Sequence, residues 1–207
     1  MPKKQKMITN LCLMEKPLNG WRMAQHDSAP GMAWTAENGV ISFDPAKGHG
    51  SDIITTKSFK DFDLSIDFKV SEGGNSGIKC FLLPNTNLGC EFQIIDDSKH
   101  PDAKLGVNGN RQTGALYDVF PPDTNKPYKG ADEWNTARIV SKGNHVEHWL
   151  NGTKILEYER GSDQFKQAIS RSKFKDTQGF ASATSSPILL QAHGDKVWYR
   201  NIKIKEL

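Results

Sequence analysis

The 207 residues include 36% hydrophobic and 9% aromatic residues, which is enough for a packed core and argues against a disordered chain. The formal net charge is only +3, with the basic excess near both ends, so no nucleic-acid-binding stripe is predicted. No apolar run is long enough to span a membrane. We expect a tail over residues 1–15, without the apolar segment of a signal peptide, and one domain over residues 16–207.

Short segments in which apolar and polar residues alternate recur along the chain, as is typical of β-strands with one buried face. In chain order they are residues 40–43, 52–56, 62–70, 76–82, 90–95, 114–117, 135–140, 145–150, 154–158, 188–191 and 197–204. Gly, Pro, Asn and Asp separate these segments, and helices do not alternate with them. The pattern predicts an all-β sandwich of two antiparallel sheets or a jelly roll.

The clearest hairpin surrounds Asn151-Gly152, the residue pair that type I′ turns prefer. With Thr153 this pair also matches a glycosylation sequon, but a tight turn is the preferred interpretation. One short helix is expected over residues 163–170, with Asp163 as its N-cap.

Two long irregular stretches, residues 96–112 and 120–132, are rich in Pro, Gly, Asn and Asp. Long loops of a compact sandwich commonly form functional rims, so we expect the entrance of a site there. Cys80 and Cys90 fall on the apolar phase of predicted strands, where buried free thiols are favoured over a disulfide between them.

Polar side chains line one face of three predicted strands. The polar set consists of Lys79, Glu91, Gln93, Gln191 and His193. If the apolar residues between them face the core, the polar set shares the opposite face. The alternative is that they cover a solvated outer sheet.

An ordinary glycoside hydrolase needs two carboxyl groups, about 5–5.5 Å apart for retention or about 6.5–9.5 Å apart for inversion. Asp96 lies an odd number of residues after Glu91, so a regular strand directs it to the opposite face. Asp97 shares the face of Glu91 but lies roughly 20 Å further along an extended strand. A two-carboxylate mechanism would need a second acid from another strand, and none is obvious.

The histidines other than His193 give a weaker signal. His145 and His148 lie three residues apart on a predicted strand, so they point to opposite faces and do not form a chelating pair. His148 shares its phase with apolar neighbours and is expected to be a core histidine with a satisfied hydrogen bond. His100 lies in the acidic loop 96–102 and is a candidate for binding a divalent cation, although a solvated loop is preferred because calcium-loop spacing is missing. No other cofactor is assigned.

A series of short motifs runs through the chain in a fixed order. They are Leu-Asn-Gly-Trp at 18–21, Gly-Asn-Ser-Gly-Ile at 74–78, the Glu-x-Gln strand at 91–97, Gly-Ala-Leu-Tyr-Asp at 114–118, Glu-Trp-Asn at 133–135, His-Trp-Leu-Asn-Gly at 148–152, Leu-Gln-Ala-His-Gly at 190–194 and Arg-Asn-Ile at 200–202. Each motif alone is weak, but the ordered series resembles the 3-keto-disaccharide hydrolase family along essentially the whole chain.

The resemblance implies a concanavalin-like jelly roll with one short helix and a sugar site on the concave face of a sheet. It also implies cleavage of glycosides already oxidised to a ketone at C3, by hydrolysis or by elimination, and export to the periplasm or beyond. Many family members place Arg where this chain has Phe81, and Lys79 is the candidate for a replacement cation.

A 3-keto sugar removes the need for two carboxylates, because the proton on C2 lies next to the C3 carbonyl and one base can abstract it. Glu91 and His193 are the candidates for base and acid, and Lys79 for the partner of the enolate oxygen. Gln93 and Gln191 suit sugar hydroxyls, since each amide offers a donor and an acceptor.

Aromatic and further polar residues complete the predicted substrate-binding set. Tyr117 and Trp149 each offer a flat face to a sugar ring, although aromatic residues of sandwiches more often lie in the core. We also assign Asn75, Asp97 and Arg200 to this set, with loop anchoring as the alternative for Arg200. The predicted partner is therefore a sugar substrate. A non-catalytic carbohydrate-binding module and a protein-interaction domain are the alternative functions.

Overall fold

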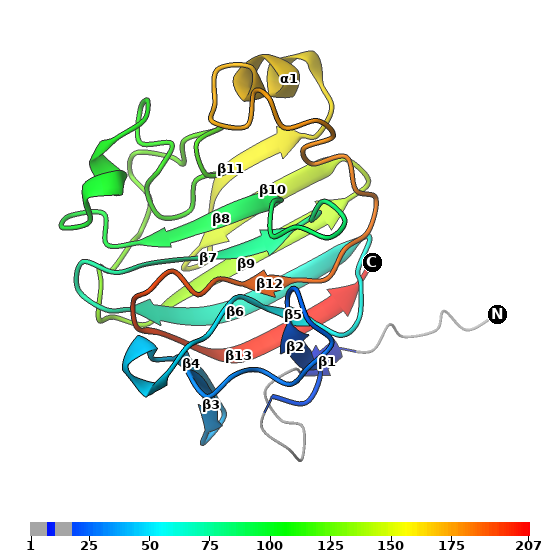
Figure 1. The fold of residues 1–207 in the computed structure, drawn as a ribbon. Helices are drawn as coiled ribbons and strands as arrows, with labels where there is room; N and C mark the ends of the chain where they lie inside the picture. The colour runs from blue at the N-terminus through cyan, green and yellow to red at the C-terminus, as the bar shows by residue number, and fades with distance from the viewer. Residues whose placement is uncertain (1–7, 11–17) are drawn as a thin grey trace.

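The computed structural model describes residues 8–10 and 18–207 and contains two antiparallel sheets that pack face to face (Figure 1). The larger sheet has the spatial order β11-β10-β9-β6-β13-β4-β3, and β1 also pairs with β13. Its strands are β1 (Ile8–Asn10), β3 (Trp34–Glu37), β4 (Val40–Phe43), β6 (Phe62–Val70), β9 (Asn135–Lys142), β10 (His145–Leu150), β11 (Thr153–Glu159) and β13 (Val197–Glu206).

The smaller sheet has the spatial order β2-β5-β12-β7-β8. Its strands are β2 (Trp21–Met23), β5 (Ile53–Thr55), β12 (Leu189–Leu190), β7 (Asn75–Cys80) and β8 (Cys90–Ile95). Every strand pair in the two sheets is antiparallel. This architecture confirms the predicted all-β jelly-roll sandwich with one short helix.

The hydrophobic core lies between the two sheets. Along β6 every second side chain is buried, from Phe62 to Val70, and these residues pack against apolar residues of β7 and β8 such as Ile78 and Phe92. Burying a side chain of this size contributes roughly 1.5–3 kcal/mol. Cys80 and Cys90 are also buried there as free thiols, and burial raises the pKa of Cys90 to about 12.

Most predicted strands have bounds close to those observed, and residues 40–43, 62–70, 90–95 and 145–150 match them. The prediction of a strand over residues 114–117 is wrong, because only Leu116 forms isolated bridges there, to Phe92 and to Phe120. Strands β2 and β3 were not expected. Strand β1 lies in the segment predicted as a tail, where it pairs with β13.

The hairpin between β10 and β11 turns at Asn151 and Gly152, whose φ angles of 47° and 86° are those of a type I′ turn. The Asn151 side chain is part of the fold, because its oxygen accepts from the backbone N–H of Thr136 at 2.8 Å. Its amide nitrogen donates to the carbonyl of Pro127 at 2.6 Å. The tight-turn interpretation is confirmed.

The short helix α1 (Asp163–Ile169) lies beyond β11 at one end of the molecule (Figure 1). Its N-cap is Ser162 and not Asp163, because the Ser162 hydroxyl accepts from the N–H of Phe165 at 3.1 Å. Asp163 occupies the first turn instead. The described part of the chain also contains two 3₁₀ turns, Pro45–Lys47 and Pro101–Lys104. No helix of the described residues is long and apolar enough to cross a membrane.

Candidate functional site

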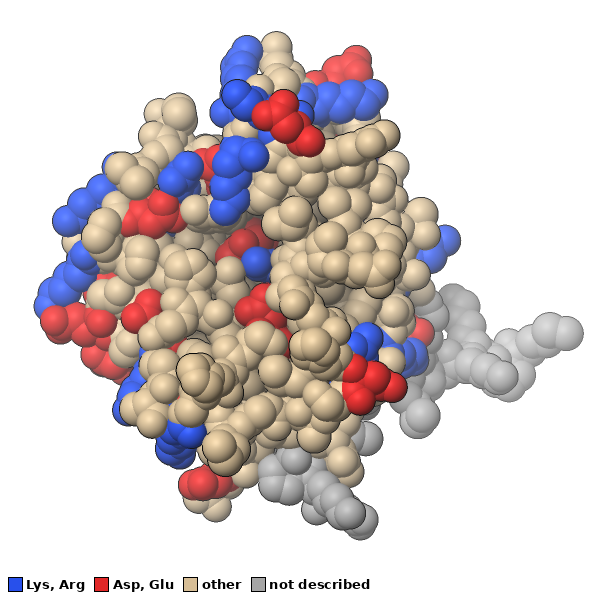
Figure 2. All heavy atoms as spheres, in the orientation of Figure 1, with Lys and Arg blue, Asp and Glu red and all other residues tan. Residues whose placement is uncertain are grey.

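The polar face of the smaller sheet, away from the core, lines a small cavity of about 60 Å³. Figure 2 shows acidic and lysine or arginine atoms on the floor of a hollow near the centre of the face drawn. We call this hollow the β7–β8 cavity. Its lining residues are Asn75, Lys79, Glu91, Gln93, Tyr117, Lys173, Gln191 and His193. The predicted polar set of Lys79, Glu91, Gln93, Gln191 and His193 therefore converges in one place.

Strand register explains this convergence. Lys79 of β7 lies directly opposite Glu91 of β8, and Gly77 lies opposite Gln93. Both strands are buried along their whole length, and the residues Lys79, Glu91 and Gln93 are only 7%, 6% and 1% exposed. For these three residues burial excludes the alternative of a solvated outer sheet, whereas Gln191 is half-buried and His193 is exposed.

The carboxylate of Glu91 is fixed from several sides. Its Oε2 lies 3.5 Å from the Lys79 ammonium. With the Gln93 amide oriented to match its neighbours, the amide nitrogen donates to Glu91 Oε1 at 3.2 Å and to the carbonyl of Ser76 at 3.0 Å. A Cβ atom on Gly77 would come within 2.3 Å of Glu91 Oε1. The glycine therefore leaves the space that the carboxylate occupies.

Asp52, on the neighbouring part of the sheet, connects two walls of the cavity. One of its carboxylate oxygens accepts from the N–H of Ala192 at 2.8 Å, and the other accepts from the Asn87 amide at 2.7 Å. The Asn87 carbonyl in turn accepts from the Lys79 ammonium at 3.4 Å. Sequence analysis did not single out Asp52, because its contacts lie far apart in the chain.

Two amide oxygens of the lining are buried without a hydrogen-bond partner in the structure. They are Asn75 Oδ1 and Gln191 Oε1. Leaving such a group unsatisfied costs about 1–3 kcal/mol. The backbone around them is fixed, since the N–H of Asn75 donates to Asp195 at 3.0 Å and the N–H of Gln191 donates to the Gly77 carbonyl at 3.0 Å. The cavity thus offers preformed acceptors to a polar ligand.

Tyr117 reaches the cavity because its N–H donates to the Glu91 carbonyl at 3.0 Å, which aligns the segment alongside β8. Its hydroxyl donates to Asp102 at 2.7 Å, and burial together with this carboxylate raises the pKa of Tyr117. The Lys173 ammonium lies 4.0 Å from the centre of the Tyr117 ring. One face of the ring is therefore covered by a cation rather than open to a sugar.

Lys173 lines the cavity although sequence analysis did not identify it. It follows α1 in a segment with no strand periodicity, so no local pattern marks it. The structure fixes its backbone through Asp118, which accepts from the N–H of Lys173 at 2.7 Å and from Arg111 Nε at 2.6 Å. Burial lowers the pKa of Lys173, with Glu91 opposing the effect and Lys79 adding to it.

The structure places two predicted sugar-binding residues on the outer face of the larger sheet, across the sandwich from the cavity. Trp149 donates to Glu147 at 2.8 Å, and the Arg138 guanidinium lies 5.2 Å from its ring centre. Arg200 lies against Asp67 at 3.4 Å and over the ring of Trp134 at 4.0 Å. Neither Trp149 nor Arg200 lines the cavity, so their assignment to this site is wrong. The alternation of apolar and polar residues indicates on which face of its strand a residue lies, but it does not indicate to which of the two sheets that strand belongs.

The acidic loop after β8 is held by contacts within the protein. Asp97, also predicted to bind substrate, accepts from the N–H of Thr113 at 2.7 Å and pairs with Lys126 at 2.8 Å, outside the cavity lining. His100 Nδ1 accepts from the N–H of Asp102 at 3.1 Å. These contacts agree with a structural loop and give no support to the cation hypothesis.

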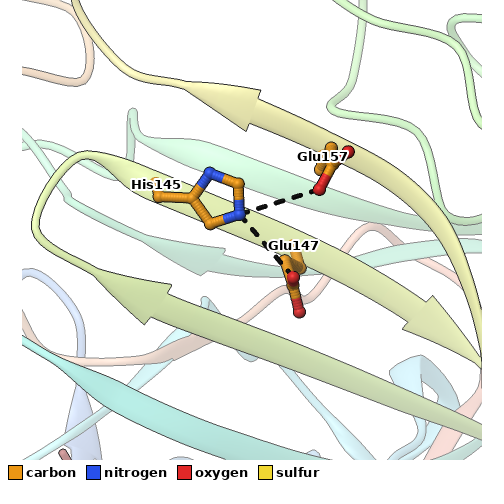
Figure 3. A group of neighbouring side chains, drawn as sticks. All are labelled: His145, Glu147 and Glu157. Carbon is orange, nitrogen blue, oxygen red and sulfur yellow. Dashed lines mark ion pairs between the residues drawn. The ribbon is translucent and has the colours of Figure 1, made fainter.

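A group of side chains of the types that can bind a metal ion is present elsewhere, on β10 and β11 (Figure 3). The ligand atoms of His145, Glu147 and Glu157 lie within 4.8 Å of one another. However, Lys154 pairs with Glu157 at 2.7 Å and with Glu147 at 3.6 Å. Trp149 also donates to Glu147. We interpret this group as a surface network of ion pairs.

Larger hollows occur on the protein, but their chemistry differs. A 470 Å³ hollow beside α1 is lined by apolar residues such as Phe165, Ile169 and Phe180, with Lys166 and Lys175 at its edge. Its lining contains no carboxylate and no imidazole. The β7–β8 cavity is smaller, yet it combines a carboxylate, ammonium groups, an imidazole and amides.

Comparisons with known proteins identify the family to which this chain belongs. A family model described as a 3-keto-alpha-glucoside-1,2-lyase-like domain matches residues 12–205. A 3-keto-disaccharide hydrolase of Bacteroides thetaiotaomicron is 35% identical over 231 aligned residues, covering 93% of this chain and 76% of the relative.

Two solved structures from Parabacteroides distasonis, both described as candidate glycosyl hydrolases, are also similar. One is 31% identical with a TM-score of 0.79, covering 91% of this chain and 89% of that protein. The other is 25% identical with a TM-score of 0.70, covering 91% of this chain and 100% of that protein. The family match and the identity over most of both chains show that this chain belongs to the family of 3-keto-α-glucoside-1,2-lyase-like domains.

Proposed function

We propose that this chain cleaves 3-keto-glycosides in the β7–β8 cavity by elimination between C1 and C2. The observation that carries the proposal is the pairing of one buried carboxylate, Glu91, with the Lys79 ammonium at 3.5 Å, in a cavity whose lining contains no second carboxylate. Glycosidases with two carboxylates need both groups beside the scissile bond. Proton abstraction next to a ketone needs only one base and one cation.

The chemistry begins at C2 of the sugar. Glu91 or His193 takes the C2 proton, and the electron pair of that bond forms an enolate whose negative charge lies on the C3 oxygen. Lys79 stabilises this oxygen because an ammonium in a poorly solvated cavity interacts strongly with developing negative charge. The enolate then collapses to restore the ketone, the C1–C2 double bond forms, and the glycosidic oxygen leaves with its electron pair.

The dimensions of the cavity favour the entry of one edge of the sugar. A volume of about 60 Å³ has room for about two water molecules and not for a whole hexose. The edge that carries C2 and C3 is the part that must meet Glu91 and Lys79. Asn75 and Gln191 then supply partners for the neighbouring hydroxyls, which satisfies their buried oxygens.

The names of the relatives support the same substrate class, since one is a 3-keto-disaccharide hydrolase and the family model is described as lyase-like. The two descriptions are compatible chemically. If water adds to the C1–C2 double bond after elimination, the net reaction is hydrolysis. If the unsaturated sugar is released, the net reaction is that of a lyase. We also propose export to the periplasm or beyond, which fractionation of the native host would test.

The test uses matched glycosides that differ only in oxidation at C3. The purified protein is expected to release the aglycone from the 3-keto-glucoside and not from the unoxidised glucoside. Glu91→Gln keeps the shape of the side chain and should reduce that release by about 10²–10⁴-fold, the usual contribution of an acid–base group. Glu147→Gln, on the outer face of the larger sheet, is the matched control and should keep full activity.

Two outcomes would reject the proposal. Full activity of Glu91→Gln would remove Glu91 from the mechanism. Binding of intact oligosaccharides without turnover of any 3-keto-glycoside would instead favour a non-catalytic carbohydrate-binding module. Product analysis by NMR distinguishes the free 3-keto sugar from the unsaturated sugar.

A further inference from the structure

The mouth of the β7–β8 cavity carries an ammonium group that the scheme above does not use. Lys79 and Glu91 are buried at the floor, whereas Lys173 and His193 are exposed at the rim. Among the described residues, Lys79 has a carboxylate and a carbonyl as neighbours, but the Lys173 ammonium makes neither an ion pair nor a hydrogen bond there. Its close neighbour is the face of Tyr117.

The position of Lys173 is built into the fold. Its backbone N–H is held by Asp118, whose other carboxylate oxygen is held by Arg111. The following residue, Phe174, is buried in the core and stacks on Phe180 with ring centres 4.1 Å apart. The segment is therefore anchored on both sides of Lys173, and the ammonium extends from a fixed point toward the cavity.

The place of the leaving group follows from the proposed function, on which this inference rests. If the C2–C3 edge of the sugar meets the floor, C1 and its glycosidic oxygen lie toward the rim, where the aglycone has room to extend outward. An alkoxide is a poor leaving group, so an alcohol leaves readily only if its oxygen receives a proton as the bond breaks.

We propose that Lys173 is the general acid that protonates the departing glycosidic oxygen. As the C1–O bond breaks, its electron pair forms an O–H bond with a proton of the ammonium, and Lys173 becomes a neutral amine. The products are the alcohol and the C1–C2 unsaturated 3-keto sugar, and solvent at the rim returns the proton to the amine. The C2 proton remains the task of Glu91 or His193.

Electrostatics favour this task for Lys173. Although the residue as a whole is exposed, partial desolvation of its ammonium lowers the pKa of Lys173; Glu91 opposes this effect and Lys79 adds to it, and the net result is a stronger acid than a free lysine. The Tyr117 ring holds the ammonium without accepting its proton, since burial and Asp102 raise the pKa of Tyr117.

The experiment compares two 3-keto-glucosides, one with an alkyl aglycone and one with 4-nitrophenol, which leaves without needing a proton. Lys173→Met should reduce kcat for the alkyl glycoside by about 10²–10⁴-fold and for the nitrophenyl glycoside by a few-fold at most. Lys173→Arg keeps the cation but does not release a proton, so it should keep KM and lose kcat for the alkyl glycoside. Lys175→Met, in the same segment but outside the cavity lining, is the control and should behave as the wild type.

The outcomes separate this inference from the proposed function. An equal loss on both glycosides in Lys173→Met, or an alkyl rate restored by Lys173→Arg, would overturn the acid role while leaving cleavage of 3-keto-glycosides intact. If the wild type releases neither aglycone, the proposed function fails and the acid role fails with it. Thermal unfolding of each variant checks that the fold is kept.

Discussion

The histidine in the core makes the stability of this protein dependent on acid. His148 is 1% exposed, and its Nδ1 lies 2.9 Å from the carbonyl of Gly114. A carbonyl only accepts, so Nδ1 carries the proton of the neutral ring. The rest of the ring lies against Phe92 and Tyr158, with ring centres 4.9 Å and 5.5 Å away. The predicted core histidine with a satisfied hydrogen bond is therefore confirmed.

Burial lowers the pKa of His148 from 6.5 to about 4. The unfolded chain takes up the proton near pH 6.5, whereas the folded protein takes it up only near pH 4. The free energy of unfolding therefore falls as the pH drops from 7 to 4, and the contribution of this residue levels off below that. A difference of about 2.5 pKa units corresponds to roughly 3 kcal/mol.

Urea unfolding followed by tryptophan fluorescence at pH 7, 6, 5 and 4 measures this effect. His148→Asn is the comparison, because its amide keeps a donor near the position of Nδ1 and does not titrate. Between pH 7 and pH 4 the wild type should lose roughly 3 kcal/mol more than the variant, since carboxylates common to both cancel. Parallel profiles for the two proteins would show that His148 does not stay neutral in the fold, and the reasoning would be refuted.

Two further substitutions test the construction of the cavity. Gly77→Ala places a Cβ atom where the Glu91 carboxylate lies, so we expect the free energy of unfolding to fall by about 1–3 kcal/mol, measured by urea unfolding. We expect a larger proportional loss of activity, measured by aglycone release. Unchanged activity would show that the position of the carboxylate is not critical. In Asp118 one carboxylate oxygen accepts from the N–H of Lys173 and the other from Arg111 Nε. Asp118→Asn leaves only one oxygen to accept a hydrogen bond, which should lower the free energy of unfolding by about 1–3 kcal/mol. An unchanged urea midpoint would contradict this.

Sequence periodicity was sufficient to find the floor of the cavity. Lys79 and Glu91 alternate with apolar residues that the core must bury, and this local pattern decides which face they share. Gln191 was found in the same way, because it continues the ladder of β12 against Gly77. Where a residue belongs to a regular strand, its burial can be predicted from its immediate neighbours.

The rim could not be predicted in this way. Lys173 is placed by a bond to Asp118, 55 residues earlier in the chain, and no local pattern encodes such a contact. The error over Trp149 has a related cause. Its phase correctly placed it on a solvent-facing side, but periodicity does not tell which of two sheets a strand joins. Long-range pairing therefore limits what the sequence alone reveals about the site.

The Gly-Asn-Ser-Gly motif at residues 74–77 now has a physical explanation. The N–H of Asn75 donates a hydrogen bond to the Asp195 carboxylate. The Ser76 hydroxyl forms hydrogen bonds with the Gln191 carbonyl and with the Tyr199 hydroxyl, each at 2.7 Å. Gly77 leaves the space for the catalytic candidate Glu91. The motif thus builds the walls of the cavity and supplies little of its chemistry. Proteins that share the motif are therefore expected to share the floor, and differences in leaving group should follow from rim residues such as Lys173.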